Sequence, residues 1–182
     1  MLKAMGLSLA LFFATPSAMA DADAPSGPVE LVETTASDLS TTHGEAVADI
    51  LLRHVDADAI ARFTLGRHAN RLDQSELAAY EAAFEGFLRR QLQRHSHEIA
   101  GVRIDVVRAD QRSPRDAIVT TRIYQNEAGQ ALRWRVIERG GRWRVVDLEF
   151  AGVWLAIEQR AQINALLDRP GATIDDVIAQ LG

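Results

Sequence analysis

The stretch that decides the fold is Gln130–Phe150, QALRWRVIERGGRWRVVDLEF. Apolar residues alternate with charged ones on both sides of a Gly-Gly pair, at Leu132, Trp134 and Val136 and again at Val146, Leu148 and Phe150. A period of two is typical of a strand with one apolar face, and a Gly-Gly pair is typical of a tight turn. The stretch therefore predicts a β-hairpin.

The register of this hairpin depends on the length of the loop at Gly140-Gly141. A two-residue turn would place Trp134 opposite Asp147, whereas a three-residue loop ending in a left-handed Gly141 sorts apolar from charged faces. The second register pairs Trp134 with Val146, Leu132 with Leu148 and Arg133 with Asp147. Because a slip of one residue destroys this sorting, we predict the three-residue loop.

Two earlier strands show the same alternation, at Val102–Val106 and Val119–Ile123, and turn residues follow at Asn126–Gly129. Apolar spacings of three and four predict helices around this block. They are expected at Pro28–Thr42, Gly44–His54, Asp56–Leu65, Asp73–His95, Val153–Leu167 and Ile174–Leu181. This order predicts an α+β fold, with a four-stranded antiparallel sheet covered by helices.

The N-terminus has the three parts of a secretory signal peptide. Lys3 is the positive residue, Leu7–Ala14 is a short apolar run, and Ala18-Met19-Ala20 fits the cleavage rule. We therefore predict a signal peptide at residues 1–20, a disordered leader at 21–27 and a single domain at 28–182. The expected location is an exported compartment.

Composition excludes several classes of protein. The chain of 182 residues has 20 Lys and Arg against 25 Asp and Glu and a net charge of −5, which disfavours a nucleic-acid binder. The absence of Cys excludes disulfide scaffolds, thiolate metal sites and cysteine nucleophiles. The spacing of His95 and His97 does not suit a metal site, so we expect no metal and no cofactor.

Two carboxylates lie within predicted strands, Asp105 and Asp147. Either would be a candidate general base if it faced an apolar cavity, because burial raises the pKa of a carboxyl group. The simpler interpretation is an ion pair on the outer face, with Arg133 as the partner of Asp147. We favour the simpler interpretation and expect no catalytic residue.

Arginines concentrate around the predicted hairpin, with Glu138 as the only acidic residue between positions 133 and 144. Guanidinium groups suit phosphate oxygens and acidic partner surfaces. The candidates for contact with a partner or a headgroup are Arg133, Arg135, Arg142 and Arg144. The alternative is a solvated sheet face.

Four segments resemble one known family in the order in which that family has them. The segments are similar to motifs of the MlaC, or toluene-tolerance, family. They are HVDADAIARFTLGR at His54–Arg67, the helix at Ser75–Leu92, GRWRVVD at Gly141–Asp147, and AGVWL followed by QRAQI at 151–163. Trp154 and Ile163 differ from the usual family residues. Gln159 makes the chain more similar to the hopanoid-associated HpnM branch.

The resemblance implies a cone-shaped, cystatin-like fold related to nuclear transport factor, with an apolar cavity for acyl chains. It also implies a periplasmic lipid carrier, not an enzyme. The carrier would move a phospholipid or hopanoid-type lipid between an outer-membrane complex and an inner-membrane complex of the MCE type. It would be the substrate-binding component of an ABC transport system. We expect a monomer. The cavity would be lined by Phe84, Phe87, Leu88, Val102, Ile104, Val106, Leu132, Trp134, Val136, Val146 and Leu148.

Two alternatives remain at this stage. The chain is a small cone-fold enzyme of the isomerase or dehydratase type if a carboxylate or His faces the cavity. It is a periplasmic adaptor if the same apolar residues fill a core.

Overall fold

The computed structural model describes residues 25–124 and 129–182. The predicted signal peptide, most of the predicted leader and most of the turn predicted at Asn126–Gly129 lie outside the described residues. The helices are α1 (Pro28–Ser40), α2 (Ala46–His54), α3 (Ala57–Leu65), the 3-10 helix η1 (Gly66–Arg71), α4 (Gln74–Arg94), α5 (Ser96–Ile99), α6 (Leu155–Leu167) and α7 (Ile174–Leu181). The strands are β1 (Arg103–Ser113), β2 (Asp116–Tyr124), β3 (Gln130–Arg139), β4 (Arg142–Phe150) and β5 (Val153–Trp154).

The helices begin where capping side chains satisfy the free backbone N–H groups of the first turn. Asp56 accepts a hydrogen bond of 3.0 Å from the N–H of Ala59 at the start of α3. Asp73 accepts from the N–H of Glu76, and the Glu76 side chain accepts from the N–H of Asp73, so α4 starts with a capping box. Gly66, with φ of +57°, ends α3.

The five strands form one antiparallel sheet in the order β1-β2-β3-β4-β5. The α+β prediction is confirmed, but the prediction of four strands is wrong. Ala151 and Gly152 both have positive φ and turn the chain back, so that Val153 pairs with Phe150. The segment Val153-Trp154, predicted as the start of a helix, is therefore the fifth strand.

The predicted register of the β3–β4 hairpin is also wrong. Arg139 pairs with Arg142 across a two-residue Gly140-Gly141 turn, in which both glycines have positive φ. Between Arg135 and Val136 the register shifts because β4 contains one extra residue, a β-bulge. Beyond the bulge the pairs are Trp134 with Leu148, Leu132 with Phe150, Arg135 with Asp147 and Arg133 with Glu149. The bulge, and not a longer loop, restores the sorting of apolar and charged faces.

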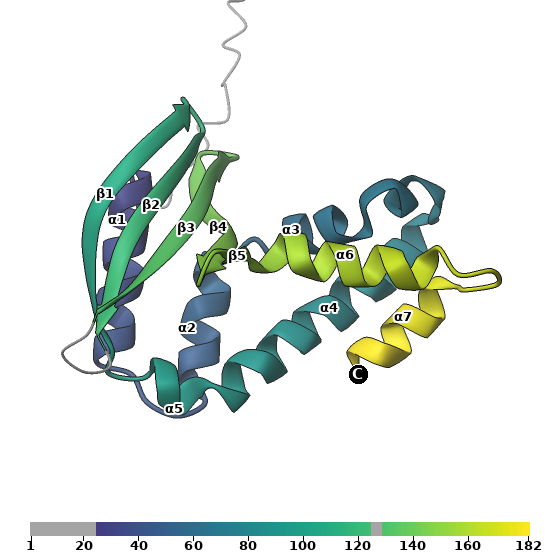
Figure 1. Ribbon diagram of the computed structural model, residues 1–182, viewed down its shortest axis with the longest axis horizontal. Helices are drawn as coiled ribbons and strands as arrows, with labels where there is room; N and C mark the ends of the chain where they lie inside the picture. Colours follow the sequence, from purple (N-terminus) through teal and green to yellow (C-terminus); the bar gives the residue numbers. More distant parts are fainter. Residues whose placement is uncertain (1–24, 125–128) are drawn as a thin grey trace, which may run out of the picture.

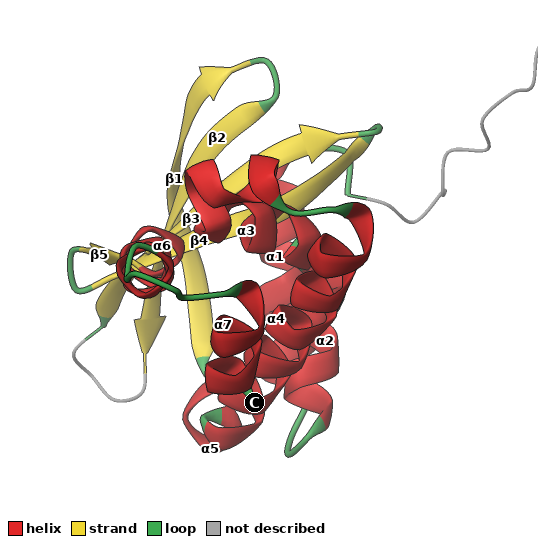
Figure 2. Ribbon diagram, turned by 90° about the vertical axis from the view of Figure 1, so that its right-hand side faces the viewer, coloured by secondary structure: helices red, strands yellow, loops and turns green. Residues whose placement is uncertain are grey.

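Buried residues of the described part of the chain form three clusters. In the sheet cluster, Leu31 and Val32 of α1 pack against Val119, Trp134 and Val136. The helical cluster joins α3, α4, α6 and α7, and a third, smaller cluster joins α1 and α2. Figure 1 shows α1 against the sheet and the four helices of the second cluster extending to one side of it. Figure 2 shows α4 running alongside α2 and α7, so α4 connects the two parts.

None of the helices in residues 25–124 and 129–182 is both long enough and apolar enough to cross a membrane.

Candidate functional site

A pocket of about 340 Å³ lies where the sheet cluster meets the helical cluster. Its wall is formed by helices α1, α2, α3 and α4, strands β3 and β4, and the first turns of α6. Its apolar lining consists of Leu51, Leu52, Val55, Ile60, Phe84, Phe87, Leu88, Leu92, Trp134, Val145, Leu148, Leu155 and Ala156. Its polar lining consists of Thr35, His54, Gln91, Asp147, Glu158 and Gln159. A mostly apolar wall with a few polar groups is typical of a ligand site.

Helix α4 supplies one continuous side of this pocket. Phe84, Phe87, Leu88, Gln91 and Leu92 recur at spacings of three and four, so they lie on one face of the helix. The rings of Phe84 and Phe87 are 6.0 Å apart, centroid to centroid. This is the helix face that the sequence predicts as the wall opposite the sheet.

Five of the eleven residues predicted to line a cavity do line this pocket, namely Phe84, Phe87, Leu88, Trp134 and Leu148. The other six lie elsewhere. Val136 is fully buried in the sheet cluster, and Ile104, Val106 and Leu132 pack against that cluster. Val146 packs against the helical cluster, and Val102 lies just before β1. The reason is α1, which covers most of the apolar sheet face with Leu31 and Val32 and leaves only its β3–β4 end to the pocket.

Most of the apolar lining residues that the prediction missed come from α2, α3 and the start of α6; Val55, Leu92 and Val145 are the others. Leu51, Leu52 and Ile60 belong to helices whose amphipathic pattern is visible in the sequence, whereas Leu155 belongs to α6, which has no clear apolar face. An amphipathic pattern shows that a residue faces inward. It does not show whether that residue faces the sheet cluster, the helical cluster or the pocket between them.

Asp147 is buried, and one of its carboxylate oxygens accepts hydrogen bonds of 2.8 Å from the N–H groups of Leu148 and Ala156. It therefore holds the first turn of α6 against β4. Burial raises the pKa of this carboxyl group, while the two N–H donors act in the opposite direction. The predicted ion pair with Arg133 is wrong, because the bulge places Asp147 beside Arg135.

Asp105, the second candidate general base, lies on the exposed side of β1. Its carboxylate is 3.4 Å from the Arg103 guanidinium and half exposed to solvent. It does not line the pocket.

His54 lines the pocket at the end of α2. Its Nε2 atom is 3.6 Å from Asp38, and burial lowers the pKa of the imidazole below 6.5 despite that carboxylate. Burial of the ring therefore favours its neutral form. Within the part of the chain that the structure describes, no group of three or more His, Asp or Glu could hold a metal ion.

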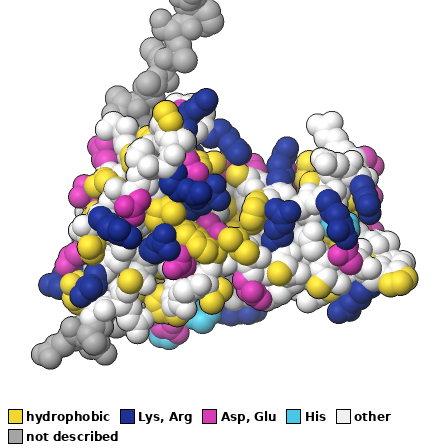
Figure 3. Space-filling model, turned by 45° about the horizontal axis from the view of Figure 1, so that its top comes forward, with side chains coloured by type: hydrophobic (Ala, Val, Ile, Leu, Met, Phe, Trp, Pro, Cys, Tyr) yellow, Lys and Arg dark blue, Asp and Glu magenta, His cyan; other side chains and the backbone are white. Residues whose placement is uncertain are grey.

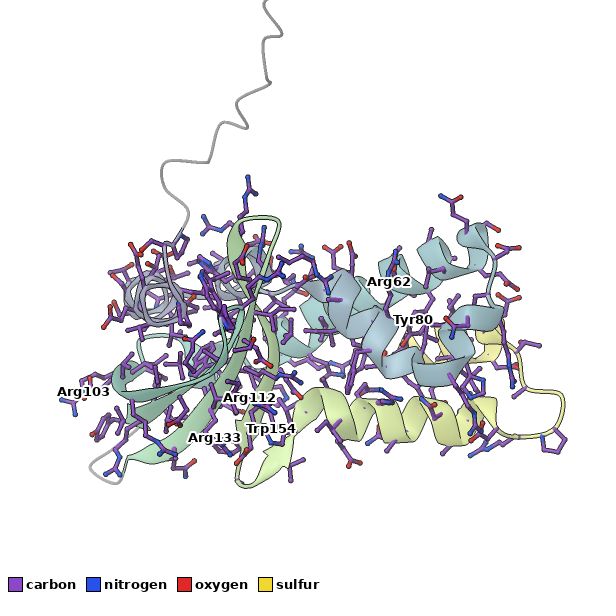
Figure 4. All side chains as sticks on the ribbon, turned by 90° about the horizontal axis from the view of Figure 1, so that it is seen from above. Arg62, Tyr80, Arg103, Arg112, Arg133 and Trp154 are labelled. Atoms are coloured by element: carbon purple, nitrogen blue, oxygen red, sulfur yellow. The ribbon has the colours of Figure 1, made fainter. Side chains whose placement is uncertain are left out.

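The predicted arginine cluster separates into two sets. Arg133 pairs with Glu149 and lies 5.3 Å from the ring centre of Trp154, as Figure 4 shows from above. Arg135 pairs with Asp116 at 3.2 Å. The second set, Arg139, Arg142 and Arg144, lines a separate hollow of about 360 Å³ together with Asp56, Asp58 and Glu85. The acids come from other elements, which the local sequence around the hairpin does not reveal.

One rim of the apolar pocket reaches the surface at the start of α6. Leu155 lines the pocket and is 52% exposed. Phe150, Val153 and Ile157 lie near it in sequence and are exposed to a similar degree. Figure 3 shows hydrophobic side chains gathered in the middle of one face of the molecule, with basic side chains beside them. At the start of α6 the pocket wall therefore includes an apolar side chain, Leu155, that is also exposed to solvent.

Comparison with known proteins supports the fold and shows the family. No curated protein matches the chain. A solved structure of a phospholipid-binding protein from Ralstonia solanacearum, in complex with a phospholipid, is similar in fold with a TM-score of 0.67. It is 16% identical in sequence, and the match covers 83% of this chain and 88% of that one. The MlaC protein family matches residues 32–182, which are most of the described domain. The chain therefore belongs to the MlaC family.

Proposed function

We propose that the protein is a periplasmic phospholipid carrier that holds an acyl chain in the apolar pocket between the sheet and the helices. The observation that carries this proposal is the pocket itself, formed by Phe84, Phe87 and Leu88 of α4 facing Trp134 and Leu148 of the sheet in an MlaC-family chain. The phospholipid in the Ralstonia solanacearum structure of similar fold supports the same ligand class.

The energetics of lipid transfer require such a pocket. Each buried methylene is worth about 0.8 kcal/mol, so one long acyl chain represents on the order of 12 kcal/mol of transfer free energy. A carrier must therefore enclose the chain to remove it from a membrane. A volume of about 340 Å³ lies at the lower end of the range for ligand pockets. It suits one chain better than two, so a second chain requires the helices to move apart.

The carrier is proposed to shuttle lipid between an outer-membrane complex and an inner-membrane ABC complex of the MCE type. Export is tested by N-terminal sequencing of the periplasmic protein, which should begin at Asp21. The proposed function includes no chemical step. Asp147 and His54 do line the pocket, which is the condition set above for the enzyme alternative, but the Asp147 oxygen accepts from Ala156 and holds α6, and the His54 ring lies 3.6 Å from Asp38.

Native mass spectrometry of the protein purified from the periplasm tests the proposal. We expect the mass of the mature chain plus one lipid, and organic extraction should identify the lipid as a phospholipid. A protein that carries no lipid after mild purification, and takes none from vesicles, would support the adaptor interpretation instead.

A further inference from the structure

Strand β1 lies at one end of the strand order, so one of its two edges is free of the other described strands. Figure 1 shows β1 as the outermost strand of the sheet, on the side away from α6. Nine of its eleven residues are exposed to solvent. The backbone N–H and C=O groups along a free edge can pair with a strand of another chain, and charged side chains normally oppose such pairing. Whether the edge of β1 accepts another strand therefore depends on the charges that lie along it.

Four charged residues alternate in sign along β1 and lie on one face of the sheet. They are Arg103, Asp105, Arg108 and Asp110. Ile104 and Val106 pack against the sheet cluster beneath α1, so the four charges point to the opposite face. Val107 is an extra residue in β1, and the register shift at this bulge keeps the second pair of charges on the same face as the first. Each Arg lies 3.4 Å from the Asp two positions further along, and the four side chains are between 47% and 67% exposed.

The order of these charges is complementary to itself when the strand is reversed. In an antiparallel pair of two β1 strands about a two-fold axis, Arg103 lies opposite Asp110 of the second copy, and Asp105 lies opposite Arg108. A shift of two residues in either direction would place Arg103 opposite Arg108 or Asp105 opposite Asp110. Opposite charges directly across an antiparallel pair stabilise it and like charges destabilise it, so the charges favour a single register.

The axis of this pair passes between Val106 and Val107, which lie opposite each other. The bulges of the two copies are then at the same level, so neither copy shifts the register of the other. Val107 is 58% exposed in the single chain, and the second copy would cover part of it. The pairing thus buries apolar surface at its centre and has charge pairs on both sides of the axis.

We propose that two copies of the chain pair along the free edges of β1 and join their sheets into one continuous antiparallel sheet. The partner is a second copy because the charge order of segment 103–110 fits its own reverse. This dimer replaces the monomer expected from the sequence, in which nothing indicates which strand lies at an edge. It does not depend on the proposed carrier function, because the described lining of the apolar pocket comes from elements other than β1. The paired segment is a small interface, so association should be reversible, with a Kd on the order of 10 μM.

Sedimentation velocity of the mature protein measures this association. Between about 1 and about 100 μM, we expect the sedimentation coefficient to rise from the monomer value toward the dimer value. The rise should become smaller as salt is added, because salt screens charge pairs at the surface. A parent protein that remains monomeric at about 100 μM would overturn the proposal.

Two charge-swapped variants test the register itself. One is Arg103→Asp with Asp105→Arg, and the other is Arg108→Asp with Asp110→Arg. Each variant keeps the net charge and the opposite signs of the two exchanged neighbours, but it places like charges opposite each other in a pair of identical copies. Each should therefore be a monomer by itself at concentrations at which the parent is a dimer. An equal mixture of the two variants places opposite charges at all four positions, so the mixture should form heterodimers about as tight as the parent dimer.

Folding is controlled in two ways. Melting temperatures close to that of the parent should show that each variant folds, since exposed ion pairs contribute little stability. The variant with all four substitutions restores the complementary order and should dimerise as the parent does.

The remaining outcomes decide between this dimer and the proposed function. Homodimers of either charge-swapped variant as tight as the parent dimer, or a mixture of folded variants that stays monomeric, would overturn the edge pairing. Lipid uptake should be equal in the parent and in all variants. A parent that dimerises as expected but takes up no lipid would contradict the carrier function and support the dimer.

Discussion

At the scale of single residues, neighbours on one strand have different surroundings. Trp134 lines the apolar pocket, whereas Val136, two positions along the same strand face, is fully buried among residues of α1 and the sheet. The alternation that identifies both as inward-facing is the same. What differs is the element that lies opposite each of them.

This difference predicts opposite results for two substitutions by Trp. Leu88 is partly buried and lines the pocket, so Leu88→Trp should fill space intended for lipid and fold with a melting temperature close to that of the parent. Val136→Trp should overpack a filled core and lower the free energy of unfolding by about 1–3 kcal/mol or more. Thermal melting and lipid extraction measure both effects. A Leu88→Trp protein that still carries a full complement of lipid would contradict the assignment of the pocket.

The stability difference between the parent and an Asp147 variant should depend on pH. Burial raises the pKa of the Asp147 carboxyl group above the ordinary 3.8, so the folded state binds a proton more readily than the unfolded state. The contribution of this group to the free energy of unfolding therefore rises as the pH falls through the raised pKa toward 3.8. An Asn can keep both hydrogen bonds to Leu148 and Ala156 because one oxygen accepts them both. Asp147→Asn should therefore be at least as stable as the parent at pH 7, and the difference should narrow toward pH 4.

The companion variant separates the charge from the hydrogen bonds. Asp147→Ala leaves two backbone N–H groups without their acceptor and should lose about 1–3 kcal/mol of unfolding free energy at both pH values. Urea denaturation at pH 4 and pH 7 measures each variant. A gap between the Asn variant and the parent that widens as the pH falls would show that the sign is wrong.

At the scale of elements, the β4–β5 turn and the bulge in β4 build the pocket. The bulge directs Asp147 to the first turn of α6, and the turn at Ala151-Gly152 sends the chain into that helix. As a result Leu155 reaches both the pocket and the solvent. A two-residue strand with little stability of its own thus places the rim of the site.

We predict that the apolar rim at the start of α6 is the route for lipid tails. Leu155→Asp should slow the uptake of fluorescent lipid from vesicles about tenfold or more, because a charge at the rim opposes passage of an acyl chain. The control is Val107→Asp on β1, where the side chain is 58% exposed and remote from the pocket lining. Equal slowing in both variants would indicate a general effect of charge and contradict the assigned route.

At the scale of the whole molecule, two buried clusters share a space that belongs to neither. The sheet cluster and the helical cluster have few residues in common, with Val55 packing against both. A ligand in the pocket would contact both clusters and add the buried area that the empty pocket lacks.

Lipid bound in the pocket should therefore stabilise the folded protein. A ligand that binds only the folded state adds about 2.7 kcal/mol at a hundred times its Kd, so lipid-loaded protein should melt several degrees above stripped protein. The increase should be absent in Leu88→Trp, whose pocket is filled. Calorimetry of loaded and stripped samples measures this, and identical melting temperatures for the two would contradict a ligand that bridges the clusters.

Much of the fold could be predicted from the sequence because local patterns determine it. The N-cap at Asp56, the capping box at Asp73, the amphipathic face of α4 and the alternation in the strands all depend on residues close together in the chain. The prediction of the hairpin register was wrong because two arrangements separate the apolar face from the charged face equally well. One is a two-residue turn followed by a bulge, the other is a three-residue loop, and the alternation of residues does not distinguish them. Only five of the eleven residues predicted to line a cavity lie in the pocket wall, because apolar residues of a pocket and of a core are chemically alike.

The sequence by itself determined the family, the α+β order of elements, the caps and the apolar face of α4, because each depends on residue types at fixed spacings. Only the tertiary structure decided three other features. It decided that α1 covers most of the sheet, that the bulge gives Asp147 to α6, and that acids from α3 and α4 face the hairpin arginines across a hollow. These features depend on which distant segments meet, and the periodicity of a single segment contains no information about its partner.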